Sequence, residues 1–503
     1  MRFKSKAVIF FVAFFFCVFT NEVNKLKIKR INPTNITNNS KSLVYNSTIW
    51  SVDNDGYVKQ AQNFLQHKGF NADPRYKHVT VRRTPGYPVF YLLHYYLLGR
   101  KGAHIVIPYT QSIIFAFSAL FLALSFFIIT DNFRFSMFLG LLYGCNPFTT
   151  GFAYYTITEA IHPAFTIFSF YFFIKLLYQT SFGIAIKTGV VSSITTLIRA
   201  SNGLLAPAII ISFFMLKGKS LFQKTKTMFV FGLGFSFLIL CWGIRNFAVV
   251  KEPVLLEKFY HEDPMAMGKS QSYLSKWWMC WGNPRPEIFT YGIIEDIKSG
   301  KNNFLDSFLL ACPSFVTSGY TKEEMVATLL SYKECVRWKI DNGKMWNWYG
   351  PKDSIPNCEE AVSSNFKNLI NKFKRKNPFR YYITSPLYSR ARLFITHSFS
   401  AQWGSLNPDK TKLSPLIRMI KSGMYLFNVV LFLNIILFLF SKVKREVKFF
   451  ILFFSITTIL FFSYNVHIEA RYSLAIYPFL YFMAIYNIYY FGNGFLKKHF
   501  VKK

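Results

Sequence analysis

Residues 105–130 read IVIPYTQSIIFAFSALFLALSFFIIT, an apolar stretch that contains no Asp, Glu, Lys or Arg. A helix needs about 20 such residues to cross the hydrocarbon layer of a bilayer. The whole chain of 503 residues is 52% hydrophobic and includes 59 Phe, which is more apolar than an average soluble protein. The stretch therefore predicts an integral membrane protein of mainly α-helical fold.

Further apolar segments recur along the chain, and hydropathy predicts about ten membrane spans. They cover residues 7–20, 105–130, 135–147, 159–178, 184–197, 204–216, 228–247, 424–440, 449–464 and 473–491. Residues 7–20 follow a basic start, as in a signal peptide, but no small-x-small cleavage pattern comes after them. We therefore expect an uncleaved first helix and a multi-pass chain.

Basic residues indicate how these spans are oriented. With the amino terminus in the cytoplasm, the basic segments 217–226, 442–448 and 497–503 all fall inside, whereas the outside turn 149–155 has no Lys or Arg. This arrangement satisfies the positive-inside rule. It leaves two long segments outside the membrane, at residues 21–104 and 248–420.

This topology predicts three domains. They are an N-terminal transmembrane module (1–250) that includes the first outside loop (21–104), an extracytoplasmic domain (251–420), and C-terminal membrane helices (421–503). The net charge of +35 would suggest nucleic acid in a soluble protein. Because much of this charge lies in short loops between spans, membrane lipids are the expected partners and nucleic acid is not.

The second outside segment contains Cys280, Cys312, Cys335 and Cys358. In an oxidising compartment they can form two disulfides, with three pairings to choose from, or remain as thiols. The same segment is rich in tryptophan, at Trp277, Trp278, Trp281, Trp338, Trp346, Trp348 and Trp403. Such side chains either stack on sugar rings and lipid headgroups or form the core of a folded domain.

The first outside segment combines an acidic pair with a basic turn. Asp53-Asn54-Asp55-Gly56-Tyr57 stands before a predicted amphipathic helix at 57–69, and Arg82-Arg83-Thr84-Pro85-Gly86-Tyr87-Pro88 follows it. One aspartate could act only as a helix N-cap, and the turn could be ordinary loop punctuation. A cap does not explain the arginines, so the pattern favours chemistry on a lipid-borne anion.

More charged residues stand at the predicted outside ends of other spans, namely Glu159, Arg199, Arg245 and the pair Arg471-Tyr472. For a single residue, a helix-dipole effect, a headgroup contact or snorkelling is a sufficient explanation. Their recurrence on one side of the membrane indicates a substrate path, because ionisable groups at membrane depth usually pair or mark a functional site.

The order of these motifs resembles the GT-C superfamily of membrane glycosyltransferases, especially the branch near protein O-mannosyltransferases and the transferase that adds aminoarabinose to lipid A. The motifs are Asp-x-x-x-Tyr, Arg-x-Pro-Gly-Tyr-Pro, a Glu at a helix start, Arg-Asn, and Arg-Tyr-x-x-x-x-x-Pro. The resemblance covers roughly residues 1–250 and 420–491 and omits the second outside segment. The first loop departs from the pattern, since it is longer and more basic before Asp53.

The resemblance implies a GT-C fold that transfers a monosaccharide from a polyprenyl-phosphate donor to an acceptor hydroxyl, with inversion. It assigns catalysis to Asp53 as general base, with Asp55 as runner-up and Glu159 as a second acidic position. Partial burial near the bilayer can raise a carboxylate pKa and so favour that base. Substrate binding falls to Tyr57, Arg82, Arg83, Tyr87, Arg199, Arg245, Arg471 and Tyr472.

The resemblance leaves the sugar, the carrier length and the acceptor open, and the acceptor can be a glycan, a lipid or a protein. No cofactor is expected, and no ligand spacing supports a divalent metal. The expected location is a bacterial inner membrane, with the site on the extracytoplasmic face. A lipid-linked saccharide transporter or flippase, and a glycan polymerase or ligase, remain the alternatives, although no paired halves typical of transporters are visible.

Overall fold

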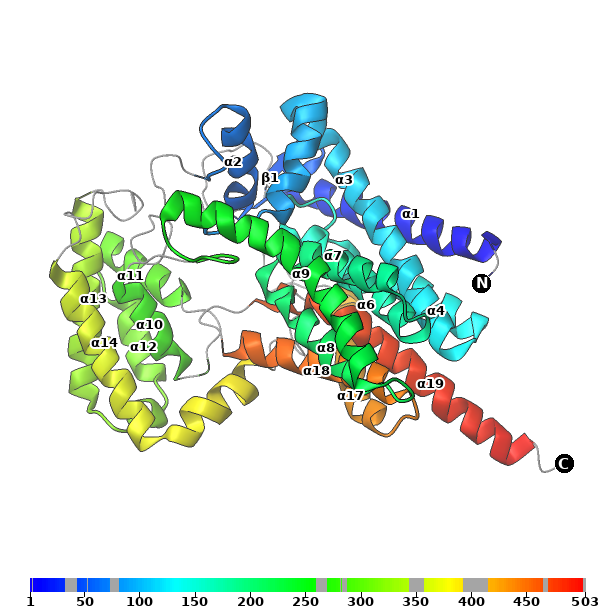
Figure 1. Cartoon of the computed structure of the whole chain (residues 1–503). Helices are drawn as coiled ribbons and strands as arrows, with labels where there is room; N and C mark the ends of the chain where they lie inside the picture. Colours follow the sequence, from blue (N-terminus) through cyan, green and yellow to red (C-terminus); the bar gives the residue numbers. More distant parts are fainter. Residues whose placement is uncertain are drawn as a thin grey trace. The chain divides into compact units, whose positions relative to one another are not determined.

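The computed structural model describes residues 1, 3–31, 43–51, 53–72, 81–258, 269–280, 282, 287–342, 357–391, 415–464 and 469–500. These residues form helices and a two-stranded sheet, which confirms the predicted mainly α class (Figure 1). The chain divides into two compact units. The first contains Met1–Lys258, Ile395–Thr458 and Arg471–Lys503, and the second contains Phe259–Phe394 and Ile459–Ala470.

The first unit begins with α1 (Phe3–Ile31), the hairpin strands β1 (Leu43–Tyr45) and β2 (Thr48–Trp50), and α2 (Asn54–Leu65). It continues with α3 (Gly86–Thr130), α4 (Phe133–Gly144), α5 (Pro147–Thr150), η2 (Thr158–Ala160), α6 (His162–Tyr178), α7 (Phe182–Ile198), η3 (Ala200–Leu204), α8 (Leu205–Phe214) and α9 (Leu221–Val250). The last elements are α17 (Pro415–Leu439), α18 (Arg445–Ser463), whose final residues belong to the second unit, η8 (Ala470–Ala475) and α19 (Tyr477–Phe500).

Among the described residues, five helices are long and apolar enough to cross a membrane: Phe3–Leu26, Gly86–Thr130, Leu221–Val250, Ser422–Leu439 and Arg445–Ser463. Helices α6 and α7 have 17 residues each, roughly 26 Å of helix against a hydrocarbon layer of about 30 Å. Length and composition thus support a membrane protein. The total of about ten spans stays a prediction.

Helix α3 extends the predicted span 105–130 towards the amino terminus and begins at Gly86. At Gly99 the backbone leaves the helical region, with φ of 67° and ψ of 174°, and the helix breaks there into two segments. The segment before the break carries the Pro-Gly-Tyr-Pro turn at its start. The basic turn at residues 82–88 is therefore attached directly to a long apolar helix.

Polar caps start the helices that follow short turns. The Asn132 side chain accepts a hydrogen bond from the Phe135 N–H at the start of α4. Ser181 does the same for α7, and Ser220 forms a capping box with Gln223 for α9. Each cap satisfies an N–H that the first turn of a helix leaves without a partner.

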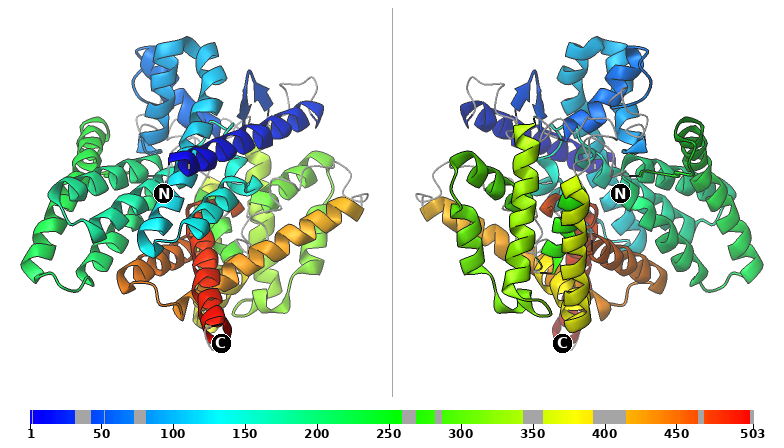
Figure 2. Two further views of the ribbon diagram at one scale, coloured as in Figure 1. Left: turned by 90° about the vertical axis from the view of Figure 1, so that its right-hand side faces the viewer. Right: turned by 90° about the vertical axis from the view of Figure 1, so that its left-hand side faces the viewer.

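Helices α7 and α9 lie along one another, as both views of Figure 2 show. A Cβ added to Gly189 would lie 2.2 Å from the Phe231 carbonyl oxygen, and one added to Gly234 would lie 2.6 Å from the Ile186 carbonyl oxygen. Only glycine permits such an approach. Close backbone contact through small residues is a common way for helices to associate in lipid.

Aromatic side chains join the early helices of the first unit to its last ones. The ring of Phe170 on α6 lies 5.3 Å from Phe450 on α18 and 5.2 Å from Phe479 on α19. Phe126 on α3 lies 5.2 Å from Phe482, also on α19. Each such pair contributes about 0.5–1.5 kcal/mol beyond the area it buries. The C-terminal helices therefore share one core with the N-terminal helices.

The second unit is formed by α10 (Lys269–Met279), α11 (Glu287–Ser299), α12 (Asn303–Ala311), η4 (Ser314–Thr317), α13 (Lys322–Asp341), α14 (Asn357–Lys376) and the π-helix η6 (Arg380–Arg390). Trp277 and Trp278 are buried in its core, and the Trp277 indole donates to the Tyr320 hydroxyl at 2.9 Å. These two tryptophans are core residues rather than stacking platforms. Trp281, Trp346, Trp348 and Trp403 lie outside the described residues.

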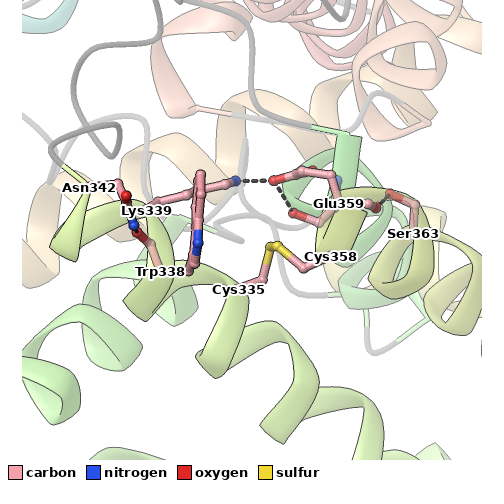
Figure 3. The surroundings of a disulfide bond; sticks show 8 residues. Cys335, Trp338, Lys339, Asn342, Cys358, Glu359 and Ser363 are labelled. Atoms are coloured by element: carbon pink, nitrogen blue, oxygen red, sulfur yellow. Dashed lines mark hydrogen bonds and ion pairs between the residues drawn. A yellow bond between two sulfur atoms is a disulfide. The ribbon is translucent and has the colours of Figure 1, made fainter. Parts of the chain in front are cut away.

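One disulfide, Cys335–Cys358, joins α13 to α14 (Figure 3). Cys280 is a buried thiol, and burial raises its pKa to about 12. Cys312 is a partly buried thiol. These four cysteines therefore form one bond and leave two thiols, so neither of the two alternatives left open by the sequence, two disulfides or four thiols, is correct.

Candidate active site

Asp53 lies between strand β2 and helix α2, in the N-cap position of that helix. Its carboxylate makes no capping hydrogen bond. The neighbouring Asn54 fixes the loop instead, because its Oδ1 accepts from the Ser51 N–H at 3.1 Å and from the Ser51 hydroxyl at 2.6 Å. The interpretation that Asp53 is only a helix cap is therefore wrong, and its carboxylate points to a contact elsewhere.

The hairpin before Asp53 is bound to the segment that precedes Glu159. Ile49 forms a parallel bridge with Tyr155, and its N–H donates to the Tyr154 carbonyl at 2.8 Å. Asn54 is fully buried, and its amide donates to the Thr156 hydroxyl. Since Glu159 follows three residues later in η2, these contacts bring two carboxylates from distant parts of the sequence into one site.

Four charged side chains form a continuous series, Asp53–Arg471–Glu159–Arg199, which we call the charge chain. Arg471 Nη2 forms an ion pair with Asp53 Oδ2, and Arg471 Nε lies 3.4 Å from Glu159 Oε1. Arg199 Nη1 donates to the same Glu159 oxygen at 2.7 Å. The Glu159 side chain is 4% exposed and that of Asp53 is 38% exposed. The charge chain therefore has a buried carboxylate inside it and an accessible carboxylate at one end.

The electrostatic environment of Asp53 opposes protonation. Burial alone would raise its pKa, but the charge and hydrogen bond of Arg471 and the charge of Arg83 outweigh this effect, so the pKa lies below the ordinary 3.8. The expectation of a raised pKa for this carboxylate is therefore wrong. Asp53 can accept a proton readily only after the guanidinium of Arg471 moves away from it.

Arg83 stands beside Asp53 and is held by aromatic side chains. Its guanidinium lies 5.0 Å from the ring centroid of Tyr57, whose ring lies 5.7 Å from that of Tyr87. Tyr87 is fully buried, and its hydroxyl donates to Gln111 Oε1 at 2.8 Å. These distances fit a cation–π contact of Arg83 with Tyr57, and the Tyr57 ring in turn packs against Tyr87.

The Pro-Gly turn brings Arg83 close to the end of α7. A Cβ on Gly86 would lie 2.5 Å from the Ile198 backbone nitrogen, so only glycine fits there. The Thr84 hydroxyl donates to the Ile198 carbonyl at 3.4 Å. Because Arg199 follows Ile198 directly, this backbone contact places the two arginines on neighbouring segments of one site.

Tyr472 lies between the two arginines of the charge chain. Its ring centroid is 4.7 Å from the Arg199 guanidinium and 6.0 Å from that of Arg471. Such contacts keep a guanidinium group oriented while its N–H groups remain directed at anions. The predicted Arg-Tyr pair therefore contributes one charged residue and one positioning residue.

Two predicted residues lie away from the charge chain. Asp55 is in the first turn of α2, where it forms an ion pair of 2.7 Å with Lys59. Arg245 donates to the Phe70 carbonyl at 2.7 Å and stacks on Trp242 at 4.6 Å. Asp55 therefore forms an ion pair on the surface of α2, and Arg245 anchors the loop at Phe70.

Glu257 is a residue of the site that the sequence analysis missed. Lys258 N–H donates to the Val81 carbonyl at 2.9 Å, which places the segment after α9 beside the arginine turn. The charges of Arg83, Arg199 and Arg82 act on the Glu257 carboxylate, and a backbone hydrogen bond links it to Thr84. Burial raises the pKa of Glu257 above its ordinary 4.5, and these contacts reduce the shift only in part.

No local pattern in the sequence marks Glu257, because its role depends on a contact between segments that are far apart. The Trp242 indole donates to the Leu256 carbonyl at 2.9 Å, and the Asn246 amide donates to the Val254 carbonyl at 3.0 Å. Both donors lie on α9, so the helix itself fixes the returning segment. A tryptophan and an asparagine at this spacing on an apolar helix are the nearest available signal.

The part of the chain that the structure describes contains no group of three His, Cys, Asp or Glu side chains placed to hold a metal ion. Arg471 contacts both Asp53 and Glu159. As placed, these two carboxylates are paired with guanidinium groups.

Comparison with protein-family models and with curated proteins finds no match for this chain. The GT-C resemblance therefore rests on the motifs themselves.

Proposed function

We propose that the chain is a membrane glycosyltransferase that moves a monosaccharide from a polyprenyl-phosphate donor to an acceptor hydroxyl. The observation that carries the proposal is the charge chain, Asp53–Arg471–Glu159–Arg199, with Arg83 beside Asp53. It combines an accessible carboxylate with several guanidinium groups. Guanidinium matches the oxygens of a phosphate in pairs, and a carboxylate can accept the acceptor's proton.

The charges of the site fit a phosphodiester. The site combines charged side chains that interact with one another: the arginines Arg82, Arg83, Arg199 and Arg471 and the carboxylates Asp53, Glu159 and Glu257. With four positive and three negative charges, the site has a net charge of one positive unit. A sugar linked to a polyprenyl phosphate has one negative charge at its phosphodiester. The long apolar helices of the first unit supply a surface for its isoprenoid chain.

The proposed reaction is a single displacement. The acceptor oxygen attacks the anomeric carbon while its proton passes to the Asp53 carboxylate. The bond between the anomeric carbon and the phosphate oxygen breaks, and its electron pair stays on that oxygen, which leaves polyprenyl monophosphate. Because one displacement occurs and no enzyme nucleophile takes part, the anomeric configuration inverts.

Donor binding would also prepare the base. Arg471 holds Asp53 in its ionised form through their ion pair. A phosphate that enters beside Arg83 and Arg199 attracts the Arg471 guanidinium as well, and any weakening of the Asp53 pair raises the basicity of that carboxylate. The base would then be most effective when the donor is in place.

The principal test replaces Asp53 with Asn in the full chain and measures transfer from a labelled polyprenyl-phosphate sugar in membranes. A general base is typically worth about 10²–10⁴ in rate, and the variant should lose transfer by that factor. Asp55→Asn is the matched control, since Asp55 pairs with Lys59 on the surface of α2, and it should keep its activity. Full transfer by a normally inserted Asp53→Asn chain would reject the mechanism.

A second substitution addresses the phosphate. Arg83→Gln should weaken use of the donor, because it removes a guanidinium beside Asp53, while the matched Arg245→Gln alters an arginine that anchors the Phe70 loop. The readout is the dependence of the initial rate on donor concentration. If both variants behave alike, Arg83 has no special role in binding phosphate. If the wild type binds the donor but leaves its sugar in place, a transporter of lipid-linked saccharides becomes the better proposal.

A further inference from the structure

The arginine site contains a carboxylate that the proposed transfer reaction does not use. Asp53 is assigned to the acceptor hydroxyl, and Glu159 lies inside the charge chain with contacts to Arg199 and Arg471. Glu257 is different, because it lies on the segment after α9 and its charge acts on Arg83 and Arg199. Its charge therefore stabilises the same guanidinium groups that the donor phosphate would contact.

The backbone holds Glu257 where it is. The residues on both sides of Glu257 form hydrogen bonds. The Trp242 indole donates to the Leu256 carbonyl at 2.9 Å, and the Lys258 N–H donates to the Val81 carbonyl at 2.9 Å. The backbone of Thr84, in the arginine turn, is hydrogen-bonded to Glu257. The two backbone contacts thus hold the segment beside the arginine turn, and the bond to Thr84 holds the Glu257 carboxylate at that turn.

We infer that Glu257 is an internal counter-ion of the arginine turn, whose charge balances Arg83 and Arg199 until the phosphodiester of a lipid takes over that role. The inference rests on the proposed function, because it assumes that the arginines bind a lipid phosphate. Its physical basis is that two anions compete for the same cations. An empty site with several neighbouring guanidinium groups would suffer mutual repulsion, and Glu257 relieves it while the donor is absent.

Competition makes a prediction about pH. The charged groups that act on Glu257 are Arg82, Arg83 and Arg199, and arginine keeps its charge throughout the usual pH range. When pH falls towards the raised pKa of Glu257, the competing anion is neutralised, and a phosphodiester, whose own charge does not change, should bind more tightly. A variant without this carboxylate should bind tightly at every pH.

The experiment measures the affinity of the detergent-solubilised full chain for citronellyl methyl phosphate, an isoprenoid phosphodiester, between about pH 8 and about pH 5. Wild-type affinity should rise as pH falls. Glu257→Gln should bind roughly ten-fold more tightly at the upper pH, the effect of about one pKa unit of interaction, with a flat profile. Dimethyl phosphate, which lacks the chain, should bind much more weakly than the lipid.

Glu252→Gln is the matched control, because Glu252 lies on the same segment and pairs with Lys258 at its exposed surface. It should follow the wild type, and Glu257→Asp, which keeps the charge, should remain pH-dependent. Equal affinity of wild type and a folded Glu257→Gln at all pH values would overturn the inference and leave the donor site standing. Failure of every variant to bind the lipid would remove the donor site itself, and equal binding of dimethyl phosphate would exclude a lipid-borne ligand.

Discussion

Two buried carboxylates in this chain, Glu359 and Glu159, belong to two different hydrogen-bond and ion-pair networks. Glu359 in the second unit accepts from the Ser270 N–H at 2.7 Å and from the Ser270 hydroxyl at 2.9 Å, and it pairs with Lys339 (Figure 3). Glu159 in the first unit contacts two arginines. Both glutamate side chains are 4% exposed, so burial alone does not distinguish them.

The difference lies in where each network ends. The Glu359 network joins three helices, α10, α13 and α14, and closes beside the Cys335–Cys358 bond. The Glu159 network continues through Arg471 to Asp53, whose side chain is 38% exposed. A closed network of buried charges serves to fix a fold, whereas one that leads to an accessible acid can exchange its partners with a substrate. The arrangement around Glu159 is therefore the better candidate for chemistry.

The largest expected effect comes from removing each buried charge. Glu159→Gln and Glu359→Gln each leave a partly buried cation without its carboxylate, and breaking a buried pair in this way typically costs about 3–5 kcal/mol of stability. Thermal unfolding of the full chain, followed by intrinsic tryptophan fluorescence, should show both losses. Only Glu159→Gln should also abolish sugar transfer at a temperature where the chain stays folded. Loss of transfer in folded Glu359→Gln would contradict the division between the two regions.

The disulfide provides a somewhat smaller effect on the closed network. It links residues 23 apart in the sequence, and a crosslink of that size typically contributes about 2–4 kcal/mol. Cys335→Ser should make residues of the second unit more sensitive to protease, with transfer unchanged below the melting temperature. Cys312→Ser is the control, because that cysteine is a thiol. Equal protease resistance of the two variants would show that the crosslink adds little.

Much of the fold follows from local patterns in the sequence. The apolar stretch at 105–130 lies within α3, and the Asn, Ser and Ser-Gln caps of α4, α7 and α9 stand where short turns interrupt apolar runs. The sequence patterns do not predict how long each membrane helix is. Helices α6 and α7 end after 17 residues at a polar turn, so hydropathy detects them without showing how far each one crosses a bilayer.

Most residues of the site could be predicted from the sequence, but the contacts between them could not. Asp53, Arg83, Glu159, Arg199 and Arg471 all lie in the cluster that the structure describes. The lowered pKa of Asp53 depends on Arg471, which comes from the far end of the chain, and no spacing in the sequence reveals that pair. Glu257 was missed for the same reason, since it reaches the arginines only through packing of the segment after α9.

The subtlest effect tests the open end of the charge chain. Arg471→Gln removes the largest interaction that lowers the pKa of Asp53, and burial, which raises this pKa, then has less to oppose it. A group with a depressed pKa stays ionised until pH falls through that low value, so in the wild type the ion pair persists across mildly acidic pH and is lost only below 3.8. In the variant Asp53 should become protonated at a higher pH, and the acidic limb of the pH–rate profile should move to higher pH.

The measurement is the rate of transfer as a function of pH at saturating donor, so that weaker phosphate binding does not affect the result. The matched Arg245→Gln chain should keep the wild-type limb, because Arg245 lies at the Phe70 loop. An acidic limb at the same pH in Arg471→Gln and wild type would mean that Asp53 is not the group whose ionisation limits the rate. The charge chain that ends at Asp53 would then not be the catalytic network.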